Sequence, residues 1–142
     1  MRARKGQEAV EQAKAIRQEA KRYRQKMRKA MPRVMAGFES LGDSALQEGV
    51  LPAKTKELIA IGIAMAKQCH YCIVAHVANA LEAGATQEEI LDVCRVAIMM
   101  GGGPAVAYSR LTMKAIEELE GTRLVSPPSE EGRVDKKKFE HP

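Results

Sequence analysis

Residues 52–84 of this 142-residue chain read PAKTKELIAIGIAMAKQCHYCIVAHVANALEAG. The first half is rich in alanine and contains a nine-residue uncharged apolar run, a length and composition that favour a helix over a strand. Pro52 suits the first turn of this helix, which we expect to continue to about Lys67. A second helix is predicted over about 70–83, because Gly84 is a natural C-terminal stop.

Apolar residues recur at helical spacing on both sides of this stretch. Between 7 and 30 they return every three or four residues, which predicts a long amphipathic helix that Pro32 interrupts. No segment alternates apolar and polar residues as a half-buried strand would, so the sequence predicts an all-α fold. The other expected elements are a short helix and a loop over 33–50, a helix that starts with a capping box at Thr86 and Glu89 and ends near Met100, a break at 101–104, and a last helix over about 105–119 that Gly121 ends.

The composition fits one domain with a charged N-terminal helix. The chain is 45% hydrophobic and lacks Trp, so Ala, Met, Leu and Ile must fill the core. Residues 1–30 hold eleven Lys and Arg against three acidic residues, so the net charge of +5 belongs to this first segment. We interpret it as a solvated basic helix and do not expect nucleic-acid binding. We therefore divide the chain into a basic helix (1–31), a helical domain (32–121) and a disordered tail (122–142).

Two features of the sequence bear on the location of the protein. Its longest uncharged apolar run, nine residues, is far shorter than the roughly 20 that a membrane span needs. The charged N-terminus is not followed by an apolar stretch, so we expect no secretory signal. These observations favour a cytoplasmic protein without a membrane partner, where a C-x-x-C pair indicates metal binding or thiol redox chemistry rather than a disulfide scaffold.

Cys69, Cys72 and His76 are spaced to act together. On a helix that begins near residue 69, Cys72 lies about 60° and His76 about 20° around the axis from Cys69, so the three side chains share one face. Cys69 can therefore reach Cys72 to form a disulfide. His76, one turn after Cys72, can exchange a proton with its thiol. The N-terminus of a helix also stabilises thiolate, the reactive form of cysteine.

Glu57 and Cys94 complete the set of candidate residues. Glu57 opens an apolar helix, where a carboxylate serves either as a favourable first-turn charge or as an inward group that orients His76, and the spacing does not separate the two. Cys94 has the apolar neighbours of a buried core cysteine. Zinc held by the C-x-x-C pair and His76, with Cys94 or His70 as fourth ligand, is the alternative to redox chemistry. The chain has no second paired ligand motif, so we expect neither a metal nor another cofactor.

These residues together resemble a known active-site motif. Glu57, followed twelve residues later by Cys69-x-x-Cys72 and then by x-x-x-His76, is similar to the motif of the carboxymuconolactone decarboxylase/alkyl hydroperoxidase D-like family. The resemblance covers about 32–119. It extends to KELI at 56–59, AGAT at 83–86, EEI at 88–90 and GGPA at 102–105.

The resemblance implies an all-helical fold that assembles as trimers or hexamers, with thiol peroxidase or disulfide reductase activity. In the peroxidase branch Cys72 attacks the peroxide and Cys69 resolves the sulfenic acid to a disulfide. Glu57 and His76 relay protons. The implied partners are a small peroxide or lactone-like substrate, a thiol electron-donor protein and further copies of the chain. The apolar stripe of helix 7–30, for which the sequence offers no second long helix, also favours a homo-oligomer.

Two differences within the family bear on the activity. Tyr71 stands where the alkyl hydroperoxidase D proteins have a histidine immediately before the second cysteine. The true lactone decarboxylases lack the C-x-x-C pair, so the two cysteines favour redox chemistry over decarboxylation. We therefore expect a cysteine-dependent oxidoreductase. The alternative is a lyase in which His76 and Glu57 perform proton chemistry without redox cycling.

Overall fold

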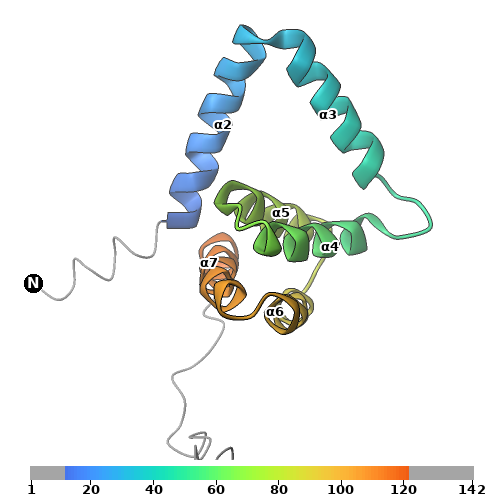
Figure 1. The fold of residues 1–142 in the computed structure, drawn as a ribbon. Helices are drawn as coiled ribbons and strands as arrows, with labels where there is room; N and C mark the ends of the chain where they lie inside the picture. Colours follow the sequence, from blue (N-terminus) through green and yellow to red (C-terminus); the bar gives the residue numbers. More distant parts are fainter. Residues whose placement is uncertain (1–11, 122–142) are drawn as a thin grey trace, which may run out of the picture.

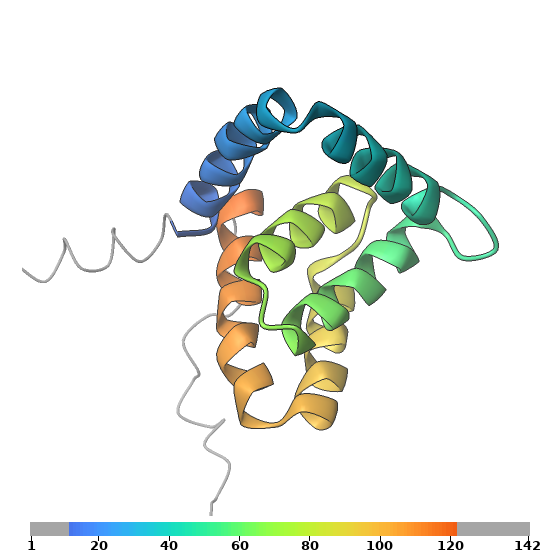
Figure 2. The same cartoon turned by 45° about the horizontal axis from the view of Figure 1, so that its top comes forward.

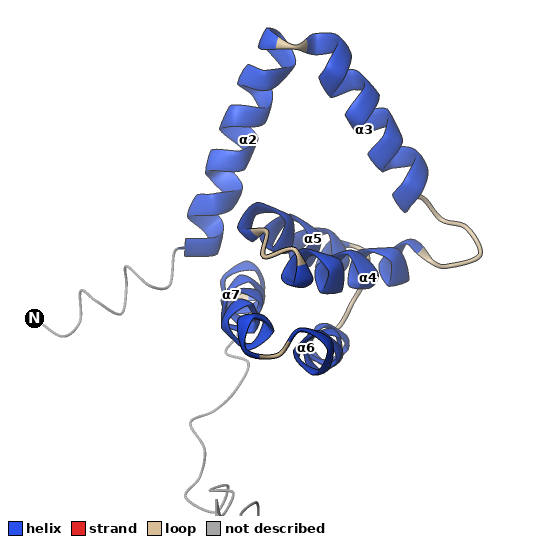
Figure 3. Cartoon of the chain, viewed as in Figure 1, coloured by secondary structure: helices blue, strands red, loops and turns tan. Residues whose placement is uncertain are grey.

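The computed structural model describes residues 12–121, and every regular element among them is an α-helix (Figure 1). Short loops join the helices, and this part of the chain contains no strand (Figure 3). The all-α fold predicted from the sequence is therefore confirmed. Residues 1–11 of the basic segment and the tail over 122–142 lie outside the described residues. The helices are α2 (Gln12–Ala30), α3 (Pro32–Leu46), α4 (Ala53–Ala66), α5 (His70–Glu82), α6 (Gln87–Gly101) and α7 (Gly103–Glu120).

Helices α4 to α7 form a bundle, and α2 and α3 stand on it as the two sides of an arch (Figures 1 and 2). In the bundle α4 packs against α5 and α6, and α7 packs against α5 and α6. The arch rests on the bundle at both ends, since α2 contacts α5 and α7 and α3 contacts α4. This arrangement leaves the inner faces of the arch only partly covered.

The turn at the apex of the arch has a local cause in the sequence. Helix α2 ends at Ala30, and Pro32 begins α3, where a proline is accepted because the first turn of a helix needs no N–H donor. The predicted interruption by Pro32 is therefore confirmed. The predicted short helix after it is longer than expected: α3 has 15 residues and continues through Gly37 and Gly42. Each interior glycine costs about 1 kcal/mol, too little to end a helix that keeps its apolar spacing.

The helix ends within the bundle follow the local signals in the sequence. At the start of α6 the Thr86 hydroxyl accepts a hydrogen bond from the Glu89 backbone N–H, and the Glu89 carboxylate accepts one from the Thr86 N–H at 2.8 Å. This is the predicted capping box. Gly121 ends α7 with a left-handed φ of 71°. The glycine-rich break between α6 and α7 is confined to Gly102, whose φ is 63°, so α7 starts two residues earlier than expected.

The core is built from small and aliphatic side chains, as the composition predicts. Its fully buried members include Ile61, Ile73 and Ile90 from three different helices. Helix α2 joins this core through Ala13, which is completely buried, while Oε2 of buried Glu118 accepts a hydrogen bond from the Lys14 backbone N–H at 2.7 Å. The first turns of α2 are thus fixed to α7. None of the described helices is long and apolar enough to cross a membrane.

Candidate redox-active site

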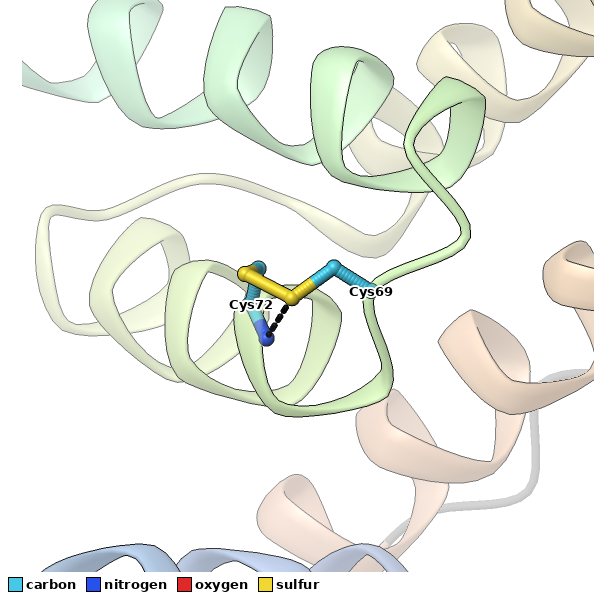
Figure 4. The surroundings of a disulfide bond; sticks show 2 residues. All are labelled: Cys69 and Cys72. Carbon is cyan, nitrogen blue, oxygen red and sulfur yellow. Dashed lines mark hydrogen bonds between the residues drawn. A yellow bond between two sulfur atoms is a disulfide. The ribbon is translucent and has the colours of Figure 1, made fainter.

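A disulfide between Cys69 and Cys72 lies at the N-terminus of α5 (Figure 4). Cys69 is the N-cap residue, and its Sγ accepts a hydrogen bond from the Cys72 backbone N–H at 3.2 Å. The chain reaches this position through Gln68, whose left-handed φ of 56° ends α4 and turns the backbone toward α5. The C-x-x-C motif therefore lies at the start of a helix, as the sequence predicts. Its two sulfurs are bonded to each other, as their spacing allows.

The Glu57 side chain points into the bundle and binds His76. Its Oε2 lies 2.7 Å from Nδ1 of His76, and its side chain is only 9% exposed. An ionised carboxylate can only accept a hydrogen bond, so Nδ1 is the ring nitrogen that carries the proton and Nε2 is left for another group. Of the two orientations that the sequence leaves open for Glu57, the structure has the inward one.

Asn79 is a third member of this cluster that the sequence analysis did not single out. Its Nδ2 donates a hydrogen bond to Oε1 of Glu57 at 3.3 Å, so both carboxylate oxygens have a partner from α5. Asn79 follows His76 by three residues and thus lies on the same face of the helix. The three-residue spacing from His76 could have pointed to Asn79 in the sequence. It does so only when Glu57 is already known to face α5.

Cys72 and His76 are one helical turn apart and both are half-buried. The two cysteines and His76 are therefore neither in the solvent nor sealed in the core, and a small molecule can approach them. Cys72 also packs against the edge of the core. The site combines a disulfide, an imidazole and a buried carboxylate at the junction of α4 and α5.

Tyr71, between the two cysteines, points away from this cluster toward the arch. Its hydroxyl donates a hydrogen bond to Oε2 of Glu19 on α2 at 2.9 Å. This hydrogen bond to a carboxylate raises the pKa of the Tyr71 phenol above its usual value. Tyr71 therefore connects the start of α5 to α2 as a neutral donor.

Cys94 lies in the core, apart from the other two cysteines. It is 4% exposed, and its Sγ is 4.0 Å from Sδ of Met65. Burial raises the pKa of its thiol, which keeps it in the unreactive neutral form. This is the environment expected from its apolar neighbours. Among residues 12–121 no group of three or more His, Cys, Asp or Glu side chains is arranged to hold a metal ion, so the zinc alternative has no clustered ligand set there.

The fold and site define a class: small all-α proteins with a C-x-x-C pair at a helix start and a glutamate–histidine pair behind it. The sequence matches the model of the carboxymuconolactone decarboxylase family over residues 32–115. The chain belongs to the carboxymuconolactone decarboxylase family.

Similar proteins of known structure have the same fold. A carboxymuconolactone decarboxylase family protein from Legionella pneumophila is 40% identical, with a TM-score of 0.71, over 78% of this chain and 96% of the other. A family member from Thermotoga maritima, described with a proposed involvement in antioxidative response, is 27% identical with a TM-score of 0.62, over 72% and 86% of the two chains. A further relative was compared by its sequence: an uncharacterized protein from Cupriavidus necator is 38% identical over 63% of this chain and 80% of its own length.

The different surroundings of the three cysteines predict different reactivity. After mild oxidation of the folded protein, peptide mapping should find a Cys69–Cys72 bridge, and iodoacetamide at neutral pH should leave Cys94 unlabelled because its buried thiol stays protonated. The same reagent should label Cys94 in urea, which serves as the control. A bridge that contains Cys94, or labelling of Cys94 in the folded protein, would contradict this assignment.

Proposed function

We propose that the protein is a thiol-based oxidoreductase that reduces a small hydroperoxide through a Cys69–Cys72 dithiol–disulfide cycle. The observation that carries the proposal is the joined pair of cysteines in the first turn of α5, one turn before a histidine bound to a buried carboxylate. This combination places a thiol, a proton carrier and a resolving thiol on one helix. No cofactor is needed for such a cycle.

The proposed cycle balances with the residues of the site. The Cys72 thiolate attacks the terminal oxygen of the hydroperoxide, the O–O bond breaks, and the alkoxide leaving group takes a proton from His76. Cys72 is then a sulfenic acid. The Cys69 thiol attacks its sulfur, the disulfide forms, and water leaves. One hydroperoxide and two thiols thus give one alcohol, one water and the disulfide that the structure contains.

The roles of the two cysteines follow from their distances along the helix. Cys72 precedes His76 by four residues and shares its face, whereas Cys69 precedes it by seven. A protonated His76 beside Cys72 stabilises its thiolate, and Glu57 holds that imidazole through Nδ1. Asn79 acts as a positioning residue, because it holds the second oxygen of Glu57.

The proposed involvement of the Thermotoga maritima relative in antioxidative response agrees with this function. The competing candidate is a lyase of the kind that the family description names, in which Glu57 and His76 move a proton without redox cycling. The hydrogen bond between them would serve either reaction. The disulfide favours the redox reaction, since a lyase has no use for it.

The nucleophile and the resolving thiol are distinguished by their serine variants. With an organic hydroperoxide, the reduced parent should consume about one equivalent and lose two free thiols. Cys72→Ser should consume none, and Cys69→Ser should stop after one oxidation with a sulfenic acid on Cys72. Thiol titration and mass spectrometry measure these outcomes. Undiminished thiols in the parent would contradict the peroxidase function and favour the lyase.

The proton relay predicts a shift in the pH dependence of Cys72. In the reduced protein, His76→Ala and Glu57→Gln should raise the midpoint pH of Cys72 alkylation by about one unit, since a neighbouring opposite charge lowers a pKa by roughly 1–3 units. Asn79→Ala should raise it by less. Glu82→Gln, on the exposed side of α5, is the control and should leave the midpoint unchanged. An unchanged midpoint in His76→Ala, or preferential labelling of Cys69, would reverse the roles assigned to the cysteines.

We also propose that the chain works as a homo-oligomer, a trimer or a hexamer. The apolar stripe along α2 is buried within the chain only at its start, at Ala13. Further along, Tyr23, Met27 and Met31 are 39–46% exposed. Across the arch on α3, Phe38 is 63% exposed. Contiguous apolar surface of this kind marks an interface, because exposing it to water is unfavourable. This apolar surface supports self-association through the arch.

Light scattering tests the assembly. The parent should have three or six times the 15.6 kDa mass of one chain. Phe38→Glu with Leu41→Glu should give a smaller species, because two charges would be buried at the interface. Ser40→Glu, on the same helix but at a polar position, is the matched control and should keep the mass of the parent. A parent that runs at 15.6 kDa would refute the oligomer.

A further inference from the structure

A groove of about 690 Å³ runs along the bundle between α4 and α6. Helix α6 lies on the far side of the bundle from the apex of the arch, so the groove and the apex are separate surfaces (Figure 1). The least exposed residues that line the groove are small, among them Gly62 and Ala97. A methyl group on Gly62 would lie 3.3 Å from Cγ1 of Val93, so this glycine lets α4 and α6 pack closely beneath the groove.

The two sides of the groove carry exposed apolar side chains. On α4, Ile59 and Ile63 are 48% and 56% exposed, and on α6, Val96 and Met100 are 60% and 76% exposed. The two residues on each helix are four apart and therefore form a row along it. Two apolar rows with small residues between them form a surface that can receive an amphipathic helix.

Helix α3 carries an exposed apolar ridge with the spacing that such a groove recognises. Val34, Phe38 and Leu41 are 63–65% exposed and occupy positions i, i+4 and i+7, so they lie on one face of the helix. Anchor residues at these positions are typical of a helix that binds in a groove. The ridge belongs to the arch and does not line the groove of its own chain. A second copy of the chain can bring the two surfaces together.

The charges of the helices favour contact between unlike surfaces of two copies. Helix α2 holds eight Lys and Arg against Glu19, a net charge of +7, whereas α6 holds three acidic residues against Arg95, a net charge of −2. Two arches in contact would bring two strongly basic helices together, and like charges at an interface are unfavourable. An arch that binds at the groove brings a basic helix to an acidic one instead.

We propose that the groove between α4 and α6 of one chain binds α3 of a second copy. The inference rests on the proposed homo-oligomer and names the surface that receives the arch. The contact is heterologous, because the two chains contribute different surfaces. Heterologous contacts close into a ring when the rotation between successive copies allows it. A ring of three is the proposed trimer, and two such rings give the hexamer.

The first test removes the apolar character of the groove. Ile63→Glu with Val96→Glu should give a smaller species than the parent in light scattering, because two charges would be buried at the interface. Both side chains are more than half exposed in the single chain, so the variant should keep the helical circular dichroism of the parent. Ile63→Leu with Val96→Leu is the matched control and should keep the mass of the parent. An unchanged mass in the glutamate variant would overturn the groove as the contact.

Cysteine cross-linking tests which surfaces meet. Phe38→Cys and Val96→Cys are placed in two chains with different tags, which are co-expressed, oxidised and treated with a short bis-maleimide. The Cys69–Cys72 disulfide and buried Cys94 leave the two new thiols as the reactive ones. The product should contain both tags, and either variant expressed alone should give no cross-linked product. Cross-linking within the Phe38→Cys protein alone would indicate contact between two arches and overturn the proposal.

The outcomes separate this inference from the proposed oligomer. If the parent has the 15.6 kDa mass of one chain, the oligomer itself fails. If the parent is assembled, but the glutamate variant keeps its mass and the two tagged chains do not cross-link, the oligomer stands and the groove fails as its contact surface.

Discussion

The hydrogen bond between Glu57 and His76 is the constraint on which the arrangement of the site depends. A carboxylate buried between α4 and α5 is costly unless its oxygens are bonded, and here α5 supplies both partners, from His76 and Asn79. This requirement fixes the rotation of α5 against α4. The same rotation turns the helix face that Cys72 and His76 share toward α4 and leaves Ile73 facing the core. The carboxylate, the imidazole and the sulfurs are therefore all positioned by the packing of α5 against α4.

Around this hydrogen bond the fold consists of two parts, a bundle and an arch. The bundle of α4 to α7 has a core of small and aliphatic side chains and holds the disulfide at the start of α5. The arch of α2 and α3 is attached at the bundle through Ala13 and the hydrogen bond of Lys14, and again through Tyr71. Tyr71, which lies between the two cysteines, thus attaches α2 to the start of α5. The disulfide thus belongs to the bundle, while the arch contributes to its surroundings through Tyr71.

Local signals in the sequence predicted most of the fold, because they act within a few residues. The Thr86 capping box and the C-terminal Gly121 are examples, and both have the expected geometry. The length of α3 was underestimated, since Gly37 breaks a helix only where nothing else supports it. The motif identified the family, but the orientation of Glu57 and the part played by Asn79 depend on how two helices meet. Contacts between helices are not encoded in the spacing along either one.

The apex of the arch has a consequence for handling the protein. Helices α2 and α3 meet at Met31, and the exposed Lys29 and Arg33 flank this turn. A joint that stands clear of the core opens more readily than the bundle, and exposed chain near basic residues is what trypsin cleaves. Among residues 12–121, limited digestion should therefore cut at the apex before it cuts in the bundle, and separate α2 from the bundle. Resistance of this site to trypsin would indicate that another molecule covers the arch. Limited digestion therefore tests whether the arch is exposed in a purified sample.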